Sequence, residues 1–351
     1  MHMADALISP SVGVTFCAVS AATIIYSARK LKEEADEKII PLMGVVGAFV
    51  FAAQMINFTI PGTGSSGHLG GGIILAILLG PYAGFLTLAS VLIIQALFFG
   101  DGGLLALGCN IFNMAFWTCF VAYPLIYRKI VKQDSRPSVI TLAALISVLV
   151  AMQLGPFSVV VQTLVSGISD LPFKSFVLLM QPIHLAIGLV EGIVTAAFIA
   201  FVRKARPEIL EAAATSRLLA QVPIRKVLIG LGVVTLLTGG ILSWFASSHP
   251  DGLEWSIERI TGKSEISEPV KGIIPLLGAI QEKSAILPDY GFKSGGPPQT
   301  DEMQGGQSER GEGWPAIASG TTVAGVVGSM MTLALAFLIG FVFKRRRSKV
   351  H

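Results

Sequence analysis

The chain has 351 residues, of which 52% are hydrophobic and 14% are charged, and its mean hydropathy is +0.70. Soluble domains carry about 25% charged residues, so this composition excludes an ordinary water-soluble domain and indicates a membrane protein. The net charge of +4 does not indicate a nucleic-acid partner, because the Lys and Arg residues lie in short loops between apolar segments. The three cysteines stand singly in apolar stretches, which argues against a disulfide framework or a thiolate metal cage.

Apolar segments recur along the chain at about the length of 20 residues that crosses the lipid bilayer. The segment 69–80 is short, and Gly80-Pro81 predicts a tight turn after it, so this helix is expected to be tilted or partly re-entrant. We therefore expect an all-α polytopic membrane protein with about nine helices. They are expected at 8–28, 40–58, 69–80, 82–99, 104–127, 138–165, 175–202, 227–247 and 320–343.

The first apolar segment begins near Ile8 and ends at Arg29-Lys30, and no Lys or Arg precedes it. A secretory signal peptide would begin with a positively charged region. We therefore expect a retained helix whose far end is cytoplasmic.

The distribution of Lys and Arg predicts the orientation, since cytoplasmic loops of membrane proteins are enriched in both. With the N-terminus outside, the inner segments hold 19 of the 26 Lys and Arg residues. The N-terminus and the loop Pro61–Leu69 then lie on the same outer side. The C-terminus lies in the cytoplasm, and the protein is a multi-pass protein of the cell membrane.

Three parts are expected along the chain. Residues 1–205 form a compact seven-helix unit, 206–226 a polar cytoplasmic linker, and 227–351 a two-helix hairpin with an extracytoplasmic loop at about 248–319. Residues 293–313 are rich in Gly, Pro, Ser, Gln and charged residues, and this composition predicts disorder.

The sequence begins Met1-His2, and these two residues are a ready chelate. The Met1 amine, the His2 backbone nitrogen and the His2 imidazole offer three nitrogens in one plane, and one further imidazole would complete a square. Planar nitrogen coordination favours Ni(II) or Cu(II) over Mg²⁺ and Ca²⁺ and over tetrahedral structural zinc. An amine and an imidazole must lose protons to bind, so capture should weaken as the pH falls. The alternative is an ordinary N-terminus without a metal.

The loop from Pro61 to Gly70 supplies a second imidazole, since His68 is one of five histidines. Its glycines allow close approach of another backbone, which a threaded N-terminal segment would need. The alternative is a flexible outer loop with His68 in solvent. Gly62 and Gly67 have the GxxxxG spacing of a phosphate-binding loop, but His68-Leu69 follows instead of Lys-Ser/Thr and no strand is expected before it, which excludes a nucleotide site.

Several long motifs together resemble the CbiM/NikM family, the substrate-capture components of energy-coupling-factor uptake systems for cobalt and nickel. The resemblance covers about 1–205. Its motifs are Met1–Pro10, Phe51–Phe58, Gly64–Gly72, Leu79–Pro81, Gln95–Leu104, Leu107–Asn110 and His184–Gly192.

This resemblance implies a metal site made by Met1, His2 and His68 and a seven-helix unit like the substrate-binding component of such transporters. It also implies that the chain is a transport subunit and not an enzyme. The metal, Ni²⁺ or Co²⁺, is cargo, and no cofactor is expected. The partners implied are a transmembrane coupling (T) component and cytoplasmic ATPase subunits.

The segment His249-Pro-Asp-Gly-Leu-Glu254 resembles the PDGLE motif, found beside or fused to such proteins in the role of the small auxiliary CbiN/NikN subunit. His249, Asp251 and Glu254 are types of side chain that bind metals and could hand a metal on. The alternative is a structural turn.

Polar side chains within the apolar segments often mark function, because their burial in the membrane is costly. His184 and Glu191 are seven residues apart and share one helix face. With Asn57, they are candidates for a set that orients the metal site without binding the metal. The alternative is a hydrogen-bonded pair between helices.

Other polar residues in these segments are expected to hold helices together, with a minor alternative that they hold a threaded N-terminus. These are Gln54, Gln95, Asn110 and Asn113. Asp101 is expected to cap the helix that follows it.

Gly44, Ala48 and Ala52 form a stripe of small residues on one helix face, which permits close helix contact. The resemblance implies that this stripe docks the coupling protein. The alternative is packing within the seven-helix unit.

Three rival functions follow from the same residues. A secondary metal transporter would be driven by protons, with Glu191 and His184 as the relay. An intramembrane enzyme lacks support, because the sequence has no HExxH or GxSxG motif. A membrane scaffold would bind no metal. Planar nitrogen donors favour nickel over cobalt, and only the family resemblance sets copper aside.

Overall fold

The computed structural model describes residues 2–34, 39–132, 135–208, 210, 225–264, 266, 272–293, 315 and 319–347. In this part of the chain, six helices are long and apolar enough to cross a membrane. The protein is therefore a polytopic helical membrane protein, as the composition predicts. These six helices are Pro10–Glu33, Pro81–Phe99, Leu107–Ile130, Pro137–Ser166, Phe173–Ala205 and Ser319–Ile339.

The elements follow one another in chain order, with 3₁₀ and π-helical segments (η) between the α-helices. They are η1 (Asp5–Leu7), α1 (Pro10–Glu34), α2 (Ile39–Gln54), β1 (Phe58–Ile60), β2 (Ser65–Gly67), α3 (Gly72–Leu79), α4 (Pro81–Ile94), η2 (Gln95–Phe99), α5 (Leu107–Ile111), η3 (Phe112–Tyr127), α6 (Arg128–Ile130), α7 (Pro137–Ser166), α8 (Phe173–Ala205), α10 (Arg225–Gly240), η5 (Leu242–Phe245), α11 (Gly252–Thr261), α12 (Ile273–Ser284), η6 (Pro288–Tyr290) and α13 (Ser319–Arg347).

Proline and glycine set several helix ends. Pro81 and Pro137 are the first residues of α4 and α7, where the missing N–H costs no hydrogen bond. Gly80 has φ of +80° between α3 and α4, so the predicted turn at Gly80-Pro81 is confirmed. The helix before that turn, α3, has eight residues, all of them buried, and is too short to cross a bilayer alone. The segment at 69–80 is therefore short, as expected.

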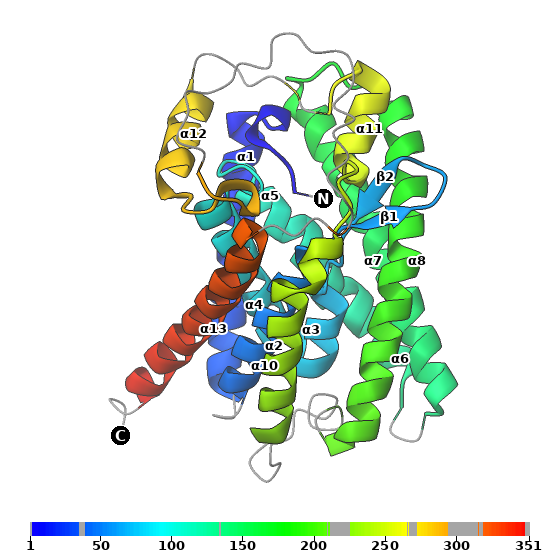
Figure 1. The fold of residues 1–351 in the computed structure, drawn as a ribbon, viewed down its shortest axis with the longest axis vertical. Coiled ribbons are helices and arrows are strands. Elements are labelled where there is room, and N and C mark those ends of the chain that lie inside the picture. Colours follow the sequence, from blue (N-terminus) through cyan, green and yellow to red (C-terminus); the bar gives the residue numbers. More distant parts are fainter. Residues whose placement is uncertain are drawn as a thin grey trace.

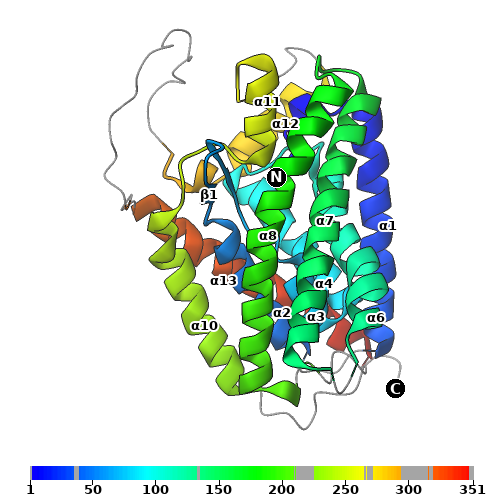
Figure 2. The same ribbon diagram turned by 90° about the vertical axis from the view of Figure 1, so that its right-hand side faces the viewer.

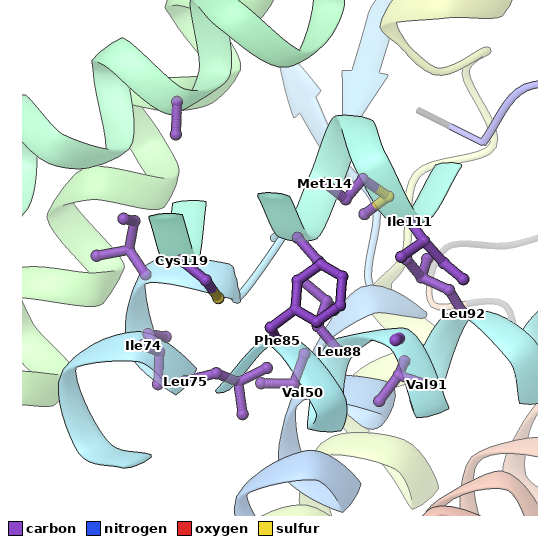
Figure 3. Packing of buried hydrophobic residues seen from close by; sticks show 14 of the residues in the cluster. Val50, Ile74, Leu75, Phe85, Leu88, Val91, Leu92, Ile111, Met114 and Cys119 are labelled. Carbon is purple, nitrogen blue, oxygen red and sulfur yellow. The ribbon is translucent and has the colours of Figure 1, made fainter. Parts of the chain in front are cut away.

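The long helices run side by side, with α11, α12 and the two strands gathered at one end (Figures 1 and 2). The helices α7 and α8 pack along each other, and α2 packs against α10 and α13. The buried centre is formed around α3 and α4. Figure 3 shows Leu75, Phe85 and Leu88 of these helices meeting Val50 of α2 and Met114 of η3.

The predicted helix 40–58 is too long at its C-terminal end. Helix α2 ends at Gln54, and the next residues form an antiparallel hairpin that pairs Phe58 with Gly67 and Ile60 with Ser65. The strands have three residues each, too few to give a period in the sequence. The hairpin is stabilised from outside, since the Ser66 N–H donates to the Pro250 carbonyl at 2.8 Å. The Pro61–Leu69 region is therefore not a flexible outer loop.

The stripe of small residues on α2 faces the C-terminal helix of the same chain. Gly44 lies against Leu333 and Ala336 of α13, and the Ser329 hydroxyl donates to the Ala48 carbonyl at 3.3 Å. Gly44, Ala48 and Ala52 are all buried. In this structure α13 lies over the face that the resemblance assigned to the coupling protein.

The expected extracytoplasmic loop at 248–319 contains two helices, α11 and α12. Residues 294–313 of the stretch expected to be disordered lie outside the described residues. The same holds for residues 209 and 211–224 of the predicted linker 206–226.

The contact between α13 and α2 gives a first prediction. A methyl group at Gly328 of α13 would overlap the buried ring of Phe51, whereas one at Gly230 of α10 would meet no atom within 4 Å. Gly328→Ala should therefore destabilise the protein by about 1–3 kcal/mol, as overpacking does. Gly230→Ala is the matched control and should keep or slightly raise stability, because Ala favours helix. Thermal unfolding in detergent measures both, and equal midpoints would contradict the packing.

Candidate metal centre

The first residues of the chain run inward and are held by polar side chains of the bundle (Figure 1). The side chain of Met3 is fully buried. The Met3 N–H donates to Asn110 Oδ1 at 2.8 Å, and the Met3 carbonyl accepts from Asn110 Nδ2 at 3.2 Å and from the Gly103 N–H at 2.9 Å. Asn110 thus binds the threaded N-terminal segment, which the sequence suggested only as the minor alternative.

A second anchor lies at Asp5, whose carboxylate is buried. Its Oδ1 accepts a hydrogen bond from the Ala106 N–H at 2.9 Å. The backbone passes so close to Gly103 that a Cβ there would overlap Asp5. This close approach explains why residue 103 is a glycine. The contact also fixes the position of the N-terminal segment, and therefore of His2, along the bundle.

The structure brings His2 and His68 together. Their rings stack with centroids 5.2 Å apart and planes 7° from parallel. The Nδ1 of His2 lies 3.0 Å from Asp101 Oδ1, and its Nε2 is buried without a hydrogen-bond partner. Met1, the third predicted ligand, lies outside the described residues.

Asp101 belongs to the site, and its expected role as a helix cap is wrong. It follows the π-helical segment η2 in a turn where Gly100 and Gly102 have φ of +71° and +81°. One carboxylate oxygen faces His2, and the other accepts from the Tyr290 hydroxyl at 2.5 Å. Burial alone would raise the pKa of Asp101, but the charge and hydrogen bond of His2 and the Tyr290 hydroxyl lower this pKa below its usual range.

His68 is presented as a neutral imidazole. Its Nδ1 lies 3.1 Å from the Leu69 carbonyl, which places the ring proton on Nδ1 and the lone pair on Nε2. Burial, together with neighbouring positive charge, lowers the pKa of His68 to about 3. A neutral imidazole is the form that binds a metal, so this ligand requires no deprotonation near neutral pH.

Glu191 anchors the chain just after His68. Its two oxygens accept the N–H groups of Gly70 and Gly71, each at 3.0 Å. Gln54 Nε2 donates to the Gly70 carbonyl at 2.9 Å and its Oε1 accepts from Gln95 at 2.8 Å. Both glutamines therefore support the loop of His68 as well as helix packing.

The other two residues of the predicted orienting set are placed differently. His184 Nδ1 lies 2.8 Å from the Met180 carbonyl, so this contact stays within α8, whereas Glu191 joins α8 to the segment after His68. His184 faces the same cavity as His68 and Glu191. Asn57 contributes its backbone carbonyl to Ser247, at 2.7 Å.

The PDGLE motif lies beside the site, against the β1–β2 hairpin. The Asp251 side chain accepts from the N–H groups of Leu253 and Glu254, and Glu254 accepts from the Asp251 N–H, which is a complete capping box for α11. The His249 carbonyl accepts from the Ser66 hydroxyl at 2.7 Å. These contacts support the structural alternative for the motif, although Asp251 also lines the cavity beside His68.

Among the residues that the structure describes, no group of three His, Cys, Asp or Glu side chains is placed to hold a metal ion. A site built on His2 and His68 therefore needs donors of another kind.

The fold defines a polytopic helical membrane protein, and comparisons with known proteins place it in the metal-transport class. The chain belongs to the CbiM family, described as the cobalt uptake substrate-specific transmembrane region, whose model matches residues 2–209. A PDGLE domain model matches residues 225–345. Both resemblances found in the sequence are confirmed.

Relatives that match most of the chain include fused nickel transport proteins. A fused nickel transport protein, NikMN, of Rhodobacter capsulatus is 33% identical over 320 residues, which are 83% of this chain and 88% of the relative. A cobalt transport protein, CbiM, of Sorangium cellulosum is 29% identical over 188 residues, 52% of this chain and 80% of the relative. The crystal structure of a truncated transition metal transporter is 30% identical, with a TM-score of 0.51, and covers 58% of this chain and 99% of that structure.

The anchoring role of Glu191 predicts that Glu191→Gln weakens metal binding, because an amide accepts only one of the two N–H groups well and loosens the loop of His68. The expected loss is about 10–100-fold, as for outer residues that orient a metal ligand. The control is Thr195→Val, one turn further on α8, where the buried hydroxyl has no hydrogen-bond partner. Titration calorimetry with Ni²⁺ in detergent measures both, and equal affinities for the two variants would show that Glu191 does not support the site.

Proposed function

We propose that this protein captures Ni²⁺ at the outer face of the cell membrane, as the substrate-binding component of an ATP-driven energy-coupling-factor transporter. The observation that carries the proposal is the threaded N-terminal segment, which brings His2 to within stacking distance of His68. The ligands proposed are the Met1 amine, the backbone and imidazole nitrogens of His2, and the His68 imidazole. Four nitrogens in one plane favour Ni(II) over Co(II).

The donor set constrains how His2 must sit when the metal is bound. A six-membered chelate ring with the His2 backbone nitrogen requires Nδ1, which here lies against Asp101. A half turn of the ring around its Cβ–Cγ bond would turn Nδ1 away from Asp101 and toward the metal. It would place Nε2 where Cε1 now lies, next to the position that now faces Asp101, and a small shift of the ring would then bring Nε2–H to this carboxylate. A carboxylate on the second nitrogen is the usual support for a metal-binding histidine.

The energy source is proposed to lie in partner subunits, namely a transmembrane coupling component and cytoplasmic ATPases. The family membership supports this assignment, and the sequence offers no nucleotide site of its own. The same proposal places the N-terminus outside and the C-terminus in the cytoplasm, from the distribution of Lys and Arg. If the coupling component uses the α2 stripe of Gly44, Ala48 and Ala52, then α13 must first move off that face.

The chelate predicts two independent ways to abolish binding. His2→Ala removes an imidazole, and a short N-terminal extension ahead of Met1 removes the free amine while His2 stays intact. Both should reduce Ni²⁺ affinity by at least about 100-fold, because a multidentate chelate loses its fused rings. His249→Ala is the control, since the contact of His249 with the hairpin uses its carbonyl. Titration calorimetry checks the three variants, and full affinity in the extended protein would refute the chelate.

The alternative is a proton-coupled secondary transporter with His184 and Glu191 as the relay. A measurement of Ni²⁺ flux distinguishes it from the proposed function. In this structure both Glu191 oxygens already accept backbone N–H groups, an arrangement suited to an anchor. We therefore expect the chain alone, reconstituted in liposomes, to show no Ni²⁺ uptake under a proton gradient. Uptake should require the partner subunits and ATP. Proton-driven uptake by the chain alone would favour the alternative.

A further inference from the structure

The C-terminal hairpin domain (residues 227–351, distinct from the β1–β2 hairpin) forms hydrogen bonds with the turn that carries Asp101. Gln281 of α12 donates from Nε2 to the carbonyls of Ala96, at 2.8 Å, and Gly102, at 2.7 Å. The N–H groups of Ile286 and Leu287 both donate to the Phe98 carbonyl, at 3.0 and 3.2 Å. The backbone on both sides of Asp101 is thus held by residues nearly 200 positions away in the sequence.

Tyr290 of the same domain contacts Asp101 directly. Its hydroxyl donates to Asp101 Oδ2 at 2.5 Å. Its ring stacks on Phe99, with centroids 5.2 Å apart and planes at 22°, and meets the edge of Phe51 at 6.3 Å. The aromatic contacts fix the direction of the hydroxyl, so the hydrogen bond does not depend on a mobile side chain.

The backbone that presents Tyr290 is strained. Asp289 and Tyr290 have φ of +49° and +59°, and they are the non-glycine residues with positive φ in the described part of the chain. This conformation is an outlier for a bulky side chain and persists only where the surroundings enforce it. Such strain is concentrated at functional sites.

The chain of contacts continues from Asp101 to the candidate metal centre. Asp101 Oδ1 lies 3.0 Å from His2 Nδ1, and the His2 ring stacks on His68. With Oδ2 occupied by Tyr290, the carboxylate is prevented from rotating and keeps Oδ1 directed at the His2 ring.

We propose that Tyr290 is a positioning residue for divalent metal capture: the C-terminal hairpin domain supplies the hydroxyl that orients Asp101, which in turn orients His2. This inference rests on the proposed function, since it assigns His2 to the metal. If Tyr290 has this role, the C-terminal hairpin domain is part of the metal site, in addition to packing against the β1–β2 hairpin.

The test uses the full chain in detergent and Ni²⁺ alone as the probe. Tyr290→Phe keeps the ring on Phe99 and removes the hydroxyl. Its Ni²⁺ affinity should fall about tenfold, the lower end for outer residues that orient a ligand, and the ligand-field absorption of bound Ni(II) should change. The control is Trp244→Phe, which removes an Nε1–H hydrogen bond to Thr322, of 2.7 Å, elsewhere in the same domain. It should leave affinity and spectrum unchanged.

A double-mutant cycle separates positioning from general stability. Asp101→Asn should weaken binding by itself, and adding Tyr290→Phe to it should cost little more, because the hydroxyl acts through the carboxylate. Additive losses, or a Tyr290→Phe variant with the affinity and spectrum of the unaltered protein, would overturn the proposal. If the unaltered protein fails to bind Ni²⁺, it is the proposed function that fails. A different result would refute only this inference. In that case the unaltered protein binds Ni²⁺, the His2→Ala variant does not bind it, and the Tyr290→Phe variant binds it with full affinity.

Discussion

The inward course of residues 2–9 is the constraint on which the rest of the site depends. A chain end is polar, and its burial is tolerated only where each N–H and carbonyl finds a partner. Met3 has both groups satisfied by Asn110 and Gly103, and the Asp5 carboxylate is met by the Ala106 N–H. These bonds come from the turn and helix that follow η2, so the segment cannot shift along its axis without losing several at once. His2 is therefore held at a defined height opposite His68.

The second half of the site is built on a different part of the fold. His68 follows the β1–β2 hairpin. Strand β2 donates a hydrogen bond to the Pro250 carbonyl, and the backbone after His68 donates to Glu191 of α8. The Trp255 Nε1–H of α11 also donates to the Thr63 carbonyl of this hairpin, at 3.0 Å. The PDGLE motif thus supports His68 through its backbone and its capping box. Its acidic residues serve first to start α11 at the right place.

Much of the fold could be predicted from hydropathy, because the bilayer requires long apolar helices and the chain provides them. The pairing of His2 with His68 also followed from the family motifs and from shared location on one side of the membrane. Asp101 and Tyr290 could not be assigned in this way, since they lie 189 positions apart and their contact depends on how the hairpin domain docks. The glycines on both sides of Asp101 were the available signal, because glycine readily adopts the positive φ that the structure shows at Gly100 and Gly102. The β1–β2 hairpin was missed because three-residue strands stabilised by a distant segment leave no periodic pattern.

The two anchoring systems bear on how a captured ion could leave. A chelate of four nitrogens binds tightly, and a shift toward release needs a state with much weaker affinity. The N-terminal segment is tied to α5 and the turn before it, whereas the His68 loop is tied to α8 and to the hairpin domain. A shift of α8 relative to α5 would separate His2 from His68. It would also break bonds that join the two sides, because Gln54 contacts both Gly70 and Gln95, and the C-terminal domain contacts both the turn of Asp101 and the β1–β2 hairpin. The proposed square of donors would then open, because the segment of His2 is held by α5 and the loop of His68 is held by α8.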